Sequence, residues 1–441
     1  MKKIISLILC SVCCDTAAAQ GTYTLEQLKQ LAVENNYNLR SARNAIQQSK
    51  ELQSEAYTKY FPSLSASGVA VTFDKPMLEI DLDMPAQLTS LLPSGTELPS
   101  SISMWKSGVF GSVSAIQPVF MGGQIINGNK LAKLGEDVSQ LKLRLSENEV
   151  EKTAEQYFWQ LASLQEKMKT IEAVDTLLRD IHKDVDVAVR AGVAMRNDLL
   201  QVELRQNDIN SQKLKLQNGL SLVRMLLSQY CGLRDTSFTI DLPLTIDHSA
   251  AQKEVDANNV QWSMVNVQCL TEYQLLQKQV EATGLQKKMA VGQNLPSVAV
   301  GAGYTYHNLL DNNHTFGMVF ATVSVPITDW WSGSHAIKRK AIEHQKAQEQ
   351  LTDNAELLKI RMQNARNGVE ESYQQLMLAQ RSIEQAKENL RLNRDYYRAG
   401  TSKMSDLLEA QLLYQQSLDK HTDAFADYQN KLLEYKQACG L

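Results

Sequence analysis

The chain has 441 residues, of which 21% are charged and 43% hydrophobic, with a formal net charge of −4 at pH 7. This balance is too mild for the basic surface that nucleic-acid binding requires, so we expect no nucleic-acid partner. The length allows several domains or one long duplicated domain.

Residues 1–20 are typical of a secretory signal peptide. Lys2 and Lys3 precede an apolar run over 4–14, and small residues over 17–19 come before Gln20, so we expect cleavage near Ala19 or Gln20. A lipid-anchored cysteine in this segment is an alternative, although none has a good lipobox context. No later apolar run reaches the roughly 20 residues that a membrane-spanning helix needs.

The cysteines outside this segment do not indicate a disulfide framework or a zinc site. They are odd in number and show no CxxC spacing: Cys231, Cys269 and Cys439.

A helical pattern begins at Thr24, where Thr24 and Gln27 fit a capping box, and runs to about Tyr60. Small and β-branched residues then predict a strand over 63–73, a long loop over 74–106 and a second strand over about 108–119. The second half predicts strands at about 298–306 and 316–325. Prolines are expected at the strand–helix junctions: Pro62, Pro118, Pro296 and Pro326.

A heptad pattern extends over 351–397, with core positions spaced alternately by four and three residues. This pattern is the signature of helices that pack side by side along their length. The core column is Leu351, Ala355, Leu358, Met362, Ala365, Val369, Ser372, Leu376, Ala379, Ile383, Ala386, Leu390, Asn393 and Tyr397.

The same pattern occurs earlier in the chain at one constant offset. Arg-Ala-Gly stands at 190–192 and 398–400, Asp-Leu-Leu at 198–200 and 406–408, and Cys-Gly-Leu at 231–233 and 439–441. The offset is 208 in each case, since 398 − 190, 406 − 198 and 439 − 231 agree. We therefore predict a structural duplication, with a first repeat over 21–238 and a second over 239–441.

The predicted strands have the length of strands that cross a bilayer at a tilt. Four strands cannot close a barrel, and an open strand edge is not tolerated in lipid, so three chains would have to pool twelve strands. Trp330-Trp331 near a strand end would suit a membrane interface. A small soluble β-domain capping a coiled coil is the alternative.

The predicted helix from Gly123 to Arg190 would be about 100 Å long, at roughly 1.5 Å for each residue. No globular core needs such a length, whereas a conduit across a periplasm does.

In the order and spacing of its motifs the chain resembles the TolC-type outer-membrane efflux factors over nearly its whole mature length. The motifs that carry the resemblance are Phe-Pro-Ser-Leu at 61–64, Gln-Pro-Val-Phe-Met-Gly-Gly at 117–123, Tyr-Arg-Ala-Gly-Thr at 397–401 with Asp-Leu-Leu at 406–408, and the internal repeat. The resemblance implies a mainly α homotrimer: a long α-helical coiled-coil barrel plus a transmembrane β-barrel shared between three chains, each giving four strands as a pair of β-hairpins.

The resemblance also implies partners and site residues. The partners are a periplasmic adaptor (membrane fusion) protein, an inner-membrane pump of RND or ABC type, and outer-membrane lipid. The turns that would meet the adaptor are Gly192-Val193 and Gly400-Thr401.

The channel entrance implied by the resemblance lies at the turn of the second repeat. Acidic residues would ring the opening and a tyrosine would hold it closed, which assigns Asp406, Glu409 and Tyr397, with Asp198 as the counterpart in the first repeat. The family's basic partner is replaced by Ser402. The alternative for Asp406 and Asp198 is an N-cap on the helix that follows.

No P-loop, HExxH or GxSxG spacing occurs, so we predict neither catalysis nor a cofactor. His335 and His344 do not share a helix face, His182 is interpreted as a tolerated core position, and no metal site is predicted.

The sequence thus predicts an exit duct in the outer membrane that extends into the periplasm and exports small molecules, with drugs, metabolites and metal ions as candidate cargo. Two alternatives stay open: a type I protein secretion duct, and a structural coiled-coil envelope protein without a lumen.

Overall fold

The computed structural model describes residues 22–75, 78–81, 101–104, 107–241, 266–308, 313–327 and 329–440. The predicted signal peptide, 1–20, lies outside the described residues. The chain divides into two compact units: unit 1 is Met1–Ala45, Ser139–Leu276 and Leu351–Leu441, and unit 2 is Ile46–Val138 and Gln277–Gln350. Each unit contains parts of both predicted repeats, and the duplication itself stays a prediction.

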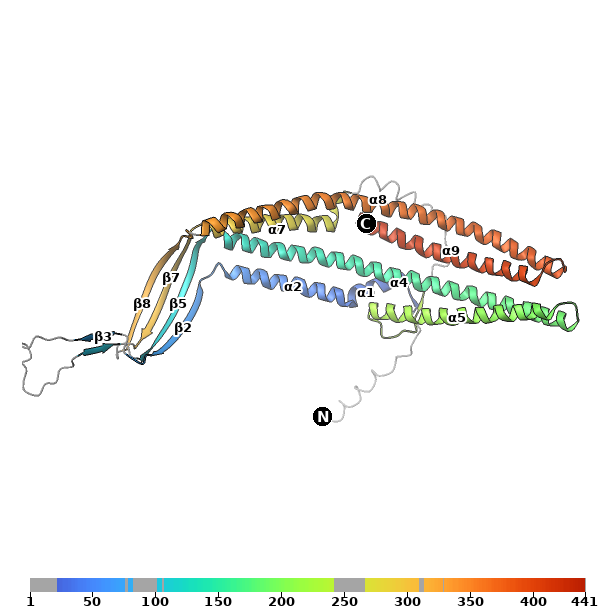
Figure 1. Cartoon of the computed structure of the whole chain (residues 1–441), viewed down its shortest axis with the longest axis horizontal. Helices are drawn as coiled ribbons and strands as arrows, with labels where there is room; N and C mark the ends of the chain where they lie inside the picture. Colours follow the sequence, from blue (N-terminus) through green and yellow to red (C-terminus); the bar gives the residue numbers. More distant parts are fainter. Residues whose placement is uncertain are drawn as a thin grey trace, which may run out of the picture. The chain divides into compact units, whose positions relative to one another are not determined.

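Unit 2 contains a four-stranded antiparallel sheet in the order β2-β5-β7-β8, visible as four long arrows in Figure 1. The strands are β2 (Ser63–Thr72), β5 (Ser107–Met121), β7 (Ser297–His307) and β8 (His314–Ser324). These bounds confirm the four predicted strands to within a few residues. β2 and β8 are the edges of the sheet.

Two predictions for this region are wrong. Pro118 does not end its strand, because β5 continues to Met121 through an irregularity in register between Pro118 and Phe120. The pairing of β5 with β2 stops at Ile116, so the missing N–H of Pro118 interrupts no bond to β2. The segment 74–106 is also not all loop, since β3 (Leu78–Asp81) pairs with β4 (Ser101–Met104).

The prolines at the other junctions lie between elements. Pro62 precedes β2, Pro296 precedes β7, and Pro326 lies between β8 and the helix that follows. A residue before proline avoids the helical region, which favours ending a helix or strand at these points.

The first helix is short, and each of the later helices is long and continuous. The helices are α1 (Leu25–Asn35), α2 (Tyr37–Thr58), α4 (Gln124–Arg190), α5 (Arg196–Cys231), α7 (Thr271–Gln293), α8 (Asp329–Arg398) and α9 (Met404–Cys439). The predicted helix 24–60 is interrupted at Asn36, whose backbone is extended and whose Oδ1 accepts a bond of 2.8 Å from the Asn38 N–H. None of the described helices is long and apolar enough to cross a membrane.

The capping box at the start of α1 is confirmed. The Gln27 N–H donates to Thr24 Oγ1 at 3.3 Å, and the Thr24 N–H donates to Gln27 Oε1 at 3.1 Å. Two otherwise unpaired backbone donors are thereby satisfied, which fixes where the helix begins.

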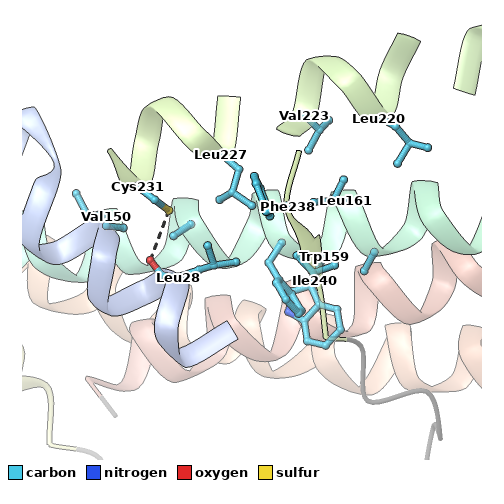
Figure 2. Packing of buried hydrophobic residues seen from close by; sticks show 14 of the residues in the cluster. Leu28, Val150, Trp159, Leu161, Leu220, Val223, Leu227, Cys231, Phe238 and Ile240 are labelled. Atoms are coloured by element: carbon cyan, nitrogen blue, oxygen red, sulfur yellow. Dashed lines mark hydrogen bonds between the residues drawn. The ribbon is translucent and has the colours of Figure 1, made fainter. Parts of the chain in front are cut away.

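The principal core of unit 1 joins α1, α4 and α5 (Figure 2). Leu28, Leu161 and Leu227 are fully buried there, and the Cys231 thiol contacts the Leu28 carbonyl oxygen at 3.5 Å. Burial raises the pKa of Cys231 to about 12, so this thiol stays neutral and serves packing.

The heptad column predicted over 351–397 lies on the covered side of α8, as expected. Val369, Ser372 and Leu376 are buried, and each of the other column residues is at least partly covered within the single chain. The 208-residue offset places Asp175 of α4 opposite Ile383 of this column, and Asp175 is also buried and is paired with Arg179.

Candidate functional site

The candidate site in unit 1 is formed by two helical turns, between α4 and α5 and between α8 and α9. In the first, Gly192 has φ 75°, its N–H donates to the Val189 carbonyl at 3.0 Å, and the Val193 N–H donates to the Ala188 carbonyl at 2.9 Å. This pair of bonds is a Schellman motif, which needs a left-handed residue after the helix.

The second turn repeats this geometry 208 residues later. Gly400 has φ 72°, its N–H donates to the Tyr397 carbonyl at 3.0 Å, and the Thr401 N–H donates to the Tyr396 carbonyl at 3.0 Å. No described atom lies within 4 Å of a side chain placed at Gly192 or Gly400, so both turns are open on the described surface.

Asp198 and Asp406 occupy the third position of their helices and are not the N-cap residues themselves. The Asp198 carboxylate accepts from the Met195 N–H at 3.3 Å, and that of Asp406 accepts from the Lys403 N–H at 3.2 Å. Ser402 Oγ also donates to Asp406, at 3.0 Å. These bonds, the one from the Lys403 backbone first, lower the pKa of Asp406 and keep it charged.

The residues beneath the turns share one apolar cluster. Met404 and Leu407 of α9 are buried with Val185 of α4 and Val202 of α5. Tyr397 packs at the edge of this cluster, where burial, and after it the negative charge of Asp198, raises its pKa. The structure therefore brings Tyr397 and Asp198 into one neighbourhood that includes both hairpins.

The acidic pair assigned to the entrance lies on the other side of α9. Asp406 and Glu409 are both exposed and are three residues apart, whereas Leu407 and Ala410 between and beside them are buried. Residues three apart on a helix share a face, so both carboxylates project from the exposed face of α9.

Large apolar side chains are exposed at the first turn. Val193 is 79% exposed and Met195, which the sequence analysis missed, is 75% exposed. The signal was available, because Met195 holds an N-cap position at which a serine, threonine or aspartate would satisfy a backbone donor. Two exposed apolar side chains so close together make this turn a candidate contact surface.

A buried polar network between α5 and α9 was also missed. Arg205 Nε donates to Gln411 Oε1 at 3.1 Å and Arg205 Nη2 donates to Gln415 Oε1 at 2.8 Å. Gln415 Nε2 in turn donates to Gln212 Oε1 at 2.9 Å. Gln411 and Gln415 are 0% and 3% exposed, so they stand where an amphipathic helix would carry apolar residues.

The turns lead to a prediction about docking. If they contact a partner, Val193→Asp combined with Met195→Asp should abolish complex formation with the cognate partner in a pull-down, because two apolar contacts become charged. Both side chains are exposed, so folding should be preserved. Gly192→Ala and Gly400→Ala are made as separate variants. A side chain at a positive φ strains the turn itself, so a loss of docking there would reflect the shape of the turn as well as its contacts.

The matched control is Leu204→Asp on α5, which also charges an exposed apolar residue but lies away from the turn. Complex formation that survives the double Asp variant would place the docking surface elsewhere.

Comparisons with known proteins agree with this geometry. Residues 274–441 match the family model described as outer membrane efflux protein. No curated protein sequence matches the chain.

Solved structures of outer membrane channels share the fold. VceC of Vibrio cholerae, an outer membrane protein, has a TM-score of 0.73 at 13% identity, over 94% of this chain and 96% of that one. The CmeC outer membrane channel of Campylobacter jejuni has a TM-score of 0.74 at 13% identity, over 94% of this chain and 85% of that one. The MtrE outer membrane channel of Neisseria gonorrhoeae has a TM-score of 0.70 at 14% identity, over 94% of this chain and 88% of that one. Residues 274–441 are thus similar to the outer membrane efflux protein family, and the chain has the fold of the TolC-type outer membrane channels.

Proposed function

We propose that this chain is the outer-membrane exit duct of an export system, works as a homotrimer with a periplasmic adaptor and an inner-membrane pump of RND or ABC type, and catalyses no reaction. The observation that carries the proposal is the sheet of unit 2, which combines strands without Asp, Glu, Lys or Arg, exposed apolar side chains and two open edges.

The strands of this sheet contain no Asp, Glu, Lys or Arg. Water-soluble sheets normally place charged side chains on an exposed face, and such charges are costly in lipid. The absence of charge from four strands, most of whose residues are exposed in the single chain, favours a lipid environment.

One face of the sheet exposes large apolar side chains in its central rows. Leu64 and Val319 share a register row and are 76% and 87% exposed, and the neighbouring rows of that face add Val113 and Tyr304. Membrane strands alternate in this way, with apolar side chains toward lipid.

The opposite face carries pairs of hydroxyl groups on β2 and β5. Ser65 Oγ lies 3.1 Å from Ser114 Oγ, and Ser67 Oγ lies 2.9 Å from Ser112 Oγ. Facing hydroxyls satisfy one another and also bind water, which suits the inner side of a channel.

The edges call for strands from other copies of the chain. Within the described residues neither β2 nor β8 has a partner on its outer side. Unpaired backbone groups cost several kcal/mol each in lipid, so strands of other copies must pair with both edges. Three chains contribute twelve strands, an even number within the known range.

The entrance is assigned to Asp406 and Glu409. In a trimer each would be present three times around the axis, and such a ring attracts cations and repels anions. Cargo selection belongs to the pump in this proposal, with small molecules as the cargo class.

The experiment is reconstitution of the mature protein into planar bilayers. We expect single-channel steps, with conductance reduced by millimolar divalent or trivalent cations added from the periplasmic side. Glu409→Gln should weaken this block and Asp406→Asn with Glu409→Gln should remove it. Tyr397→Ala should raise conductance, because the packing of this ring against the cluster beneath the turns is lost.

The matched control is Glu434→Gln, which neutralises an acid on the same helix, paired with Lys431, away from the turn. A protein without conductance would contradict the proposed function. Conductance with an unchanged block in the double variant would assign the gate to other residues and leave Asp406 with the helix-start bonds only.

A further inference from the structure

Two histidines face one another at the end of the β7–β8 hairpin. His307 ends β7, His314 begins β8, and the two are direct partners in the antiparallel register. Their rings are stacked, with centroids 5.6 Å apart and planes inclined by 27°. Directly opposed residues on a sheet have side chains close enough to hold one ligand together.

One of these rings has an unsatisfied nitrogen. His307 Nδ1 is buried and has no hydrogen-bond partner within the described residues. A buried ring nitrogen without a partner lacks the bond it would make in water, so it is a candidate donor for a ligand. The stacking of the two rings gives His307 Nδ1 no hydrogen-bond partner.

The backbone around the pair is held in place by three hydrogen bonds. The Asn308 N–H donates to the Val109 carbonyl at 3.2 Å, and the Val109 N–H donates to Asn308 Oδ1 at 2.6 Å, which ties the end of β7 to β5. Across the hairpin, Tyr306 OH donates to Asn313 Oδ1 at 3.0 Å. Phe316 lies edge-on to the His307 ring, with a centroid distance of 6.2 Å. A ligand would therefore meet two rings carried by strand ends that are already fixed in place.

The chemistry of the donors selects the ligand. Neutral imidazole is the commonest protein ligand for Zn²⁺, Cu²⁺ and Ni²⁺, and it binds Ca²⁺ and Mg²⁺ poorly. The strands of this sheet supply no lysine or arginine that would repel a cation. No group of three or more acidic, histidine or cysteine side chains suited to a metal occurs among the described residues, so a two-imidazole site with water in the other positions is the form available.

We propose that His307 and His314 form a site for one divalent transition-metal ion per chain, of the Cu²⁺, Ni²⁺ or Zn²⁺ class. The ion links β7 to β8 across the end of the hairpin. The inference is independent of the proposed export function, because it needs only the register and the two rings.

The test is Cu²⁺ binding to the full mature chain in detergent, produced without a histidine tag and followed by electron paramagnetic resonance. We expect one tightly bound Cu²⁺ per chain with hyperfine coupling to two nitrogens. His307→Phe with His314→Phe preserves two aromatic rings but no donor, and should weaken binding by at least about tenfold and abolish the two-nitrogen spectrum. Each single Phe variant should leave coupling to one nitrogen.

The matched control is His335→Phe with His344→Phe, which removes two histidines that are nine residues apart on α8. This control should retain the wild-type spectrum and affinity. A wild-type spectrum without two-nitrogen coupling, or one that persists in the His307/His314 double variant, would overturn the proposal and leave the pair as a stacking contact only.

Discussion

Replacing Leu376 by Asp should destabilise the helical part of the protein by several kcal/mol, the largest effect we expect from one substitution. Leu376 is 0% exposed and belongs to a cluster that α8 forms with Tyr428 and Leu432 of α9. A carboxylate at this position would be buried among apolar side chains, and an unpaired buried charge is among the most destabilising changes known. Leu376→Ala should cost about 2–5 kcal/mol through loss of contacts and the cavity that remains.

The measurement is the midpoint of guanidinium or thermal unfolding of the solubilised protein. Gln374→Asp is the matched control, because Gln374 lies two residues away on the same helix and is exposed. Ile383 and Leu390 are only partly covered within the single chain, so their replacement should have smaller effects before assembly. Equal shifts at 374 and 376 would show that the heptad column is not the packed face.

The strands and long helices could be predicted because their signals are local and repeated. The alternation of Ser with apolar residues over 63–67 has a period of two, whereas the column through Val369 and Leu376 has a period of 3.5. The left-handed glycines at 192 and 400 follow from the same motif at one offset. Each of these features depends on residues that are close together in the sequence, so a single sequence is enough to predict it.

Other features depend on partners that lie far away in the sequence. Proline at 118 predicts a strand end, but β5 continues to Met121 because it still pairs with β7 there. Its pairing with β2 has already ended two residues earlier, at Ile116. The break at Asn36 is accompanied by a hydrogen bond from the Asn38 N–H to the Asn36 side chain, which the composition of the segment does not predict. The Arg205 network was hidden because Gln411 and Gln415 resemble surface residues until α5 is placed beside them.

The second large effect concerns the sheet edges. If β2 of one chain pairs with β8 of the next, cysteines introduced on the two edges should form crosslinks between chains. A small set of pairs that combines Ser65→Cys or Ser67→Cys with Phe316→Cys or Met318→Cys covers the neighbouring registers, on a background with Cys269→Ser. In denaturing gels under oxidising conditions we expect a ladder that ends at three chains.

A control pair inside the sheet separates assembly from random contact. Ser112 and Thr305 are register partners on β5 and β7, so Ser112→Cys with Thr305→Cys should crosslink within one chain and give no ladder. A ladder that continues beyond three chains would indicate an open polymer. Crosslinks from the interior pair between chains would show that the sheet order differs from β2-β5-β7-β8.

The central claim is that the strands of three chains close one barrel in the membrane, and the mass of the solubilised protein tests it most directly. Light scattering with correction for bound detergent should give the mass of three mature chains, together with circular dichroism that shows the strand content of the sheet. A stable monomer that retains this strand content would contradict the account, because its open edges would then persist in an apolar environment.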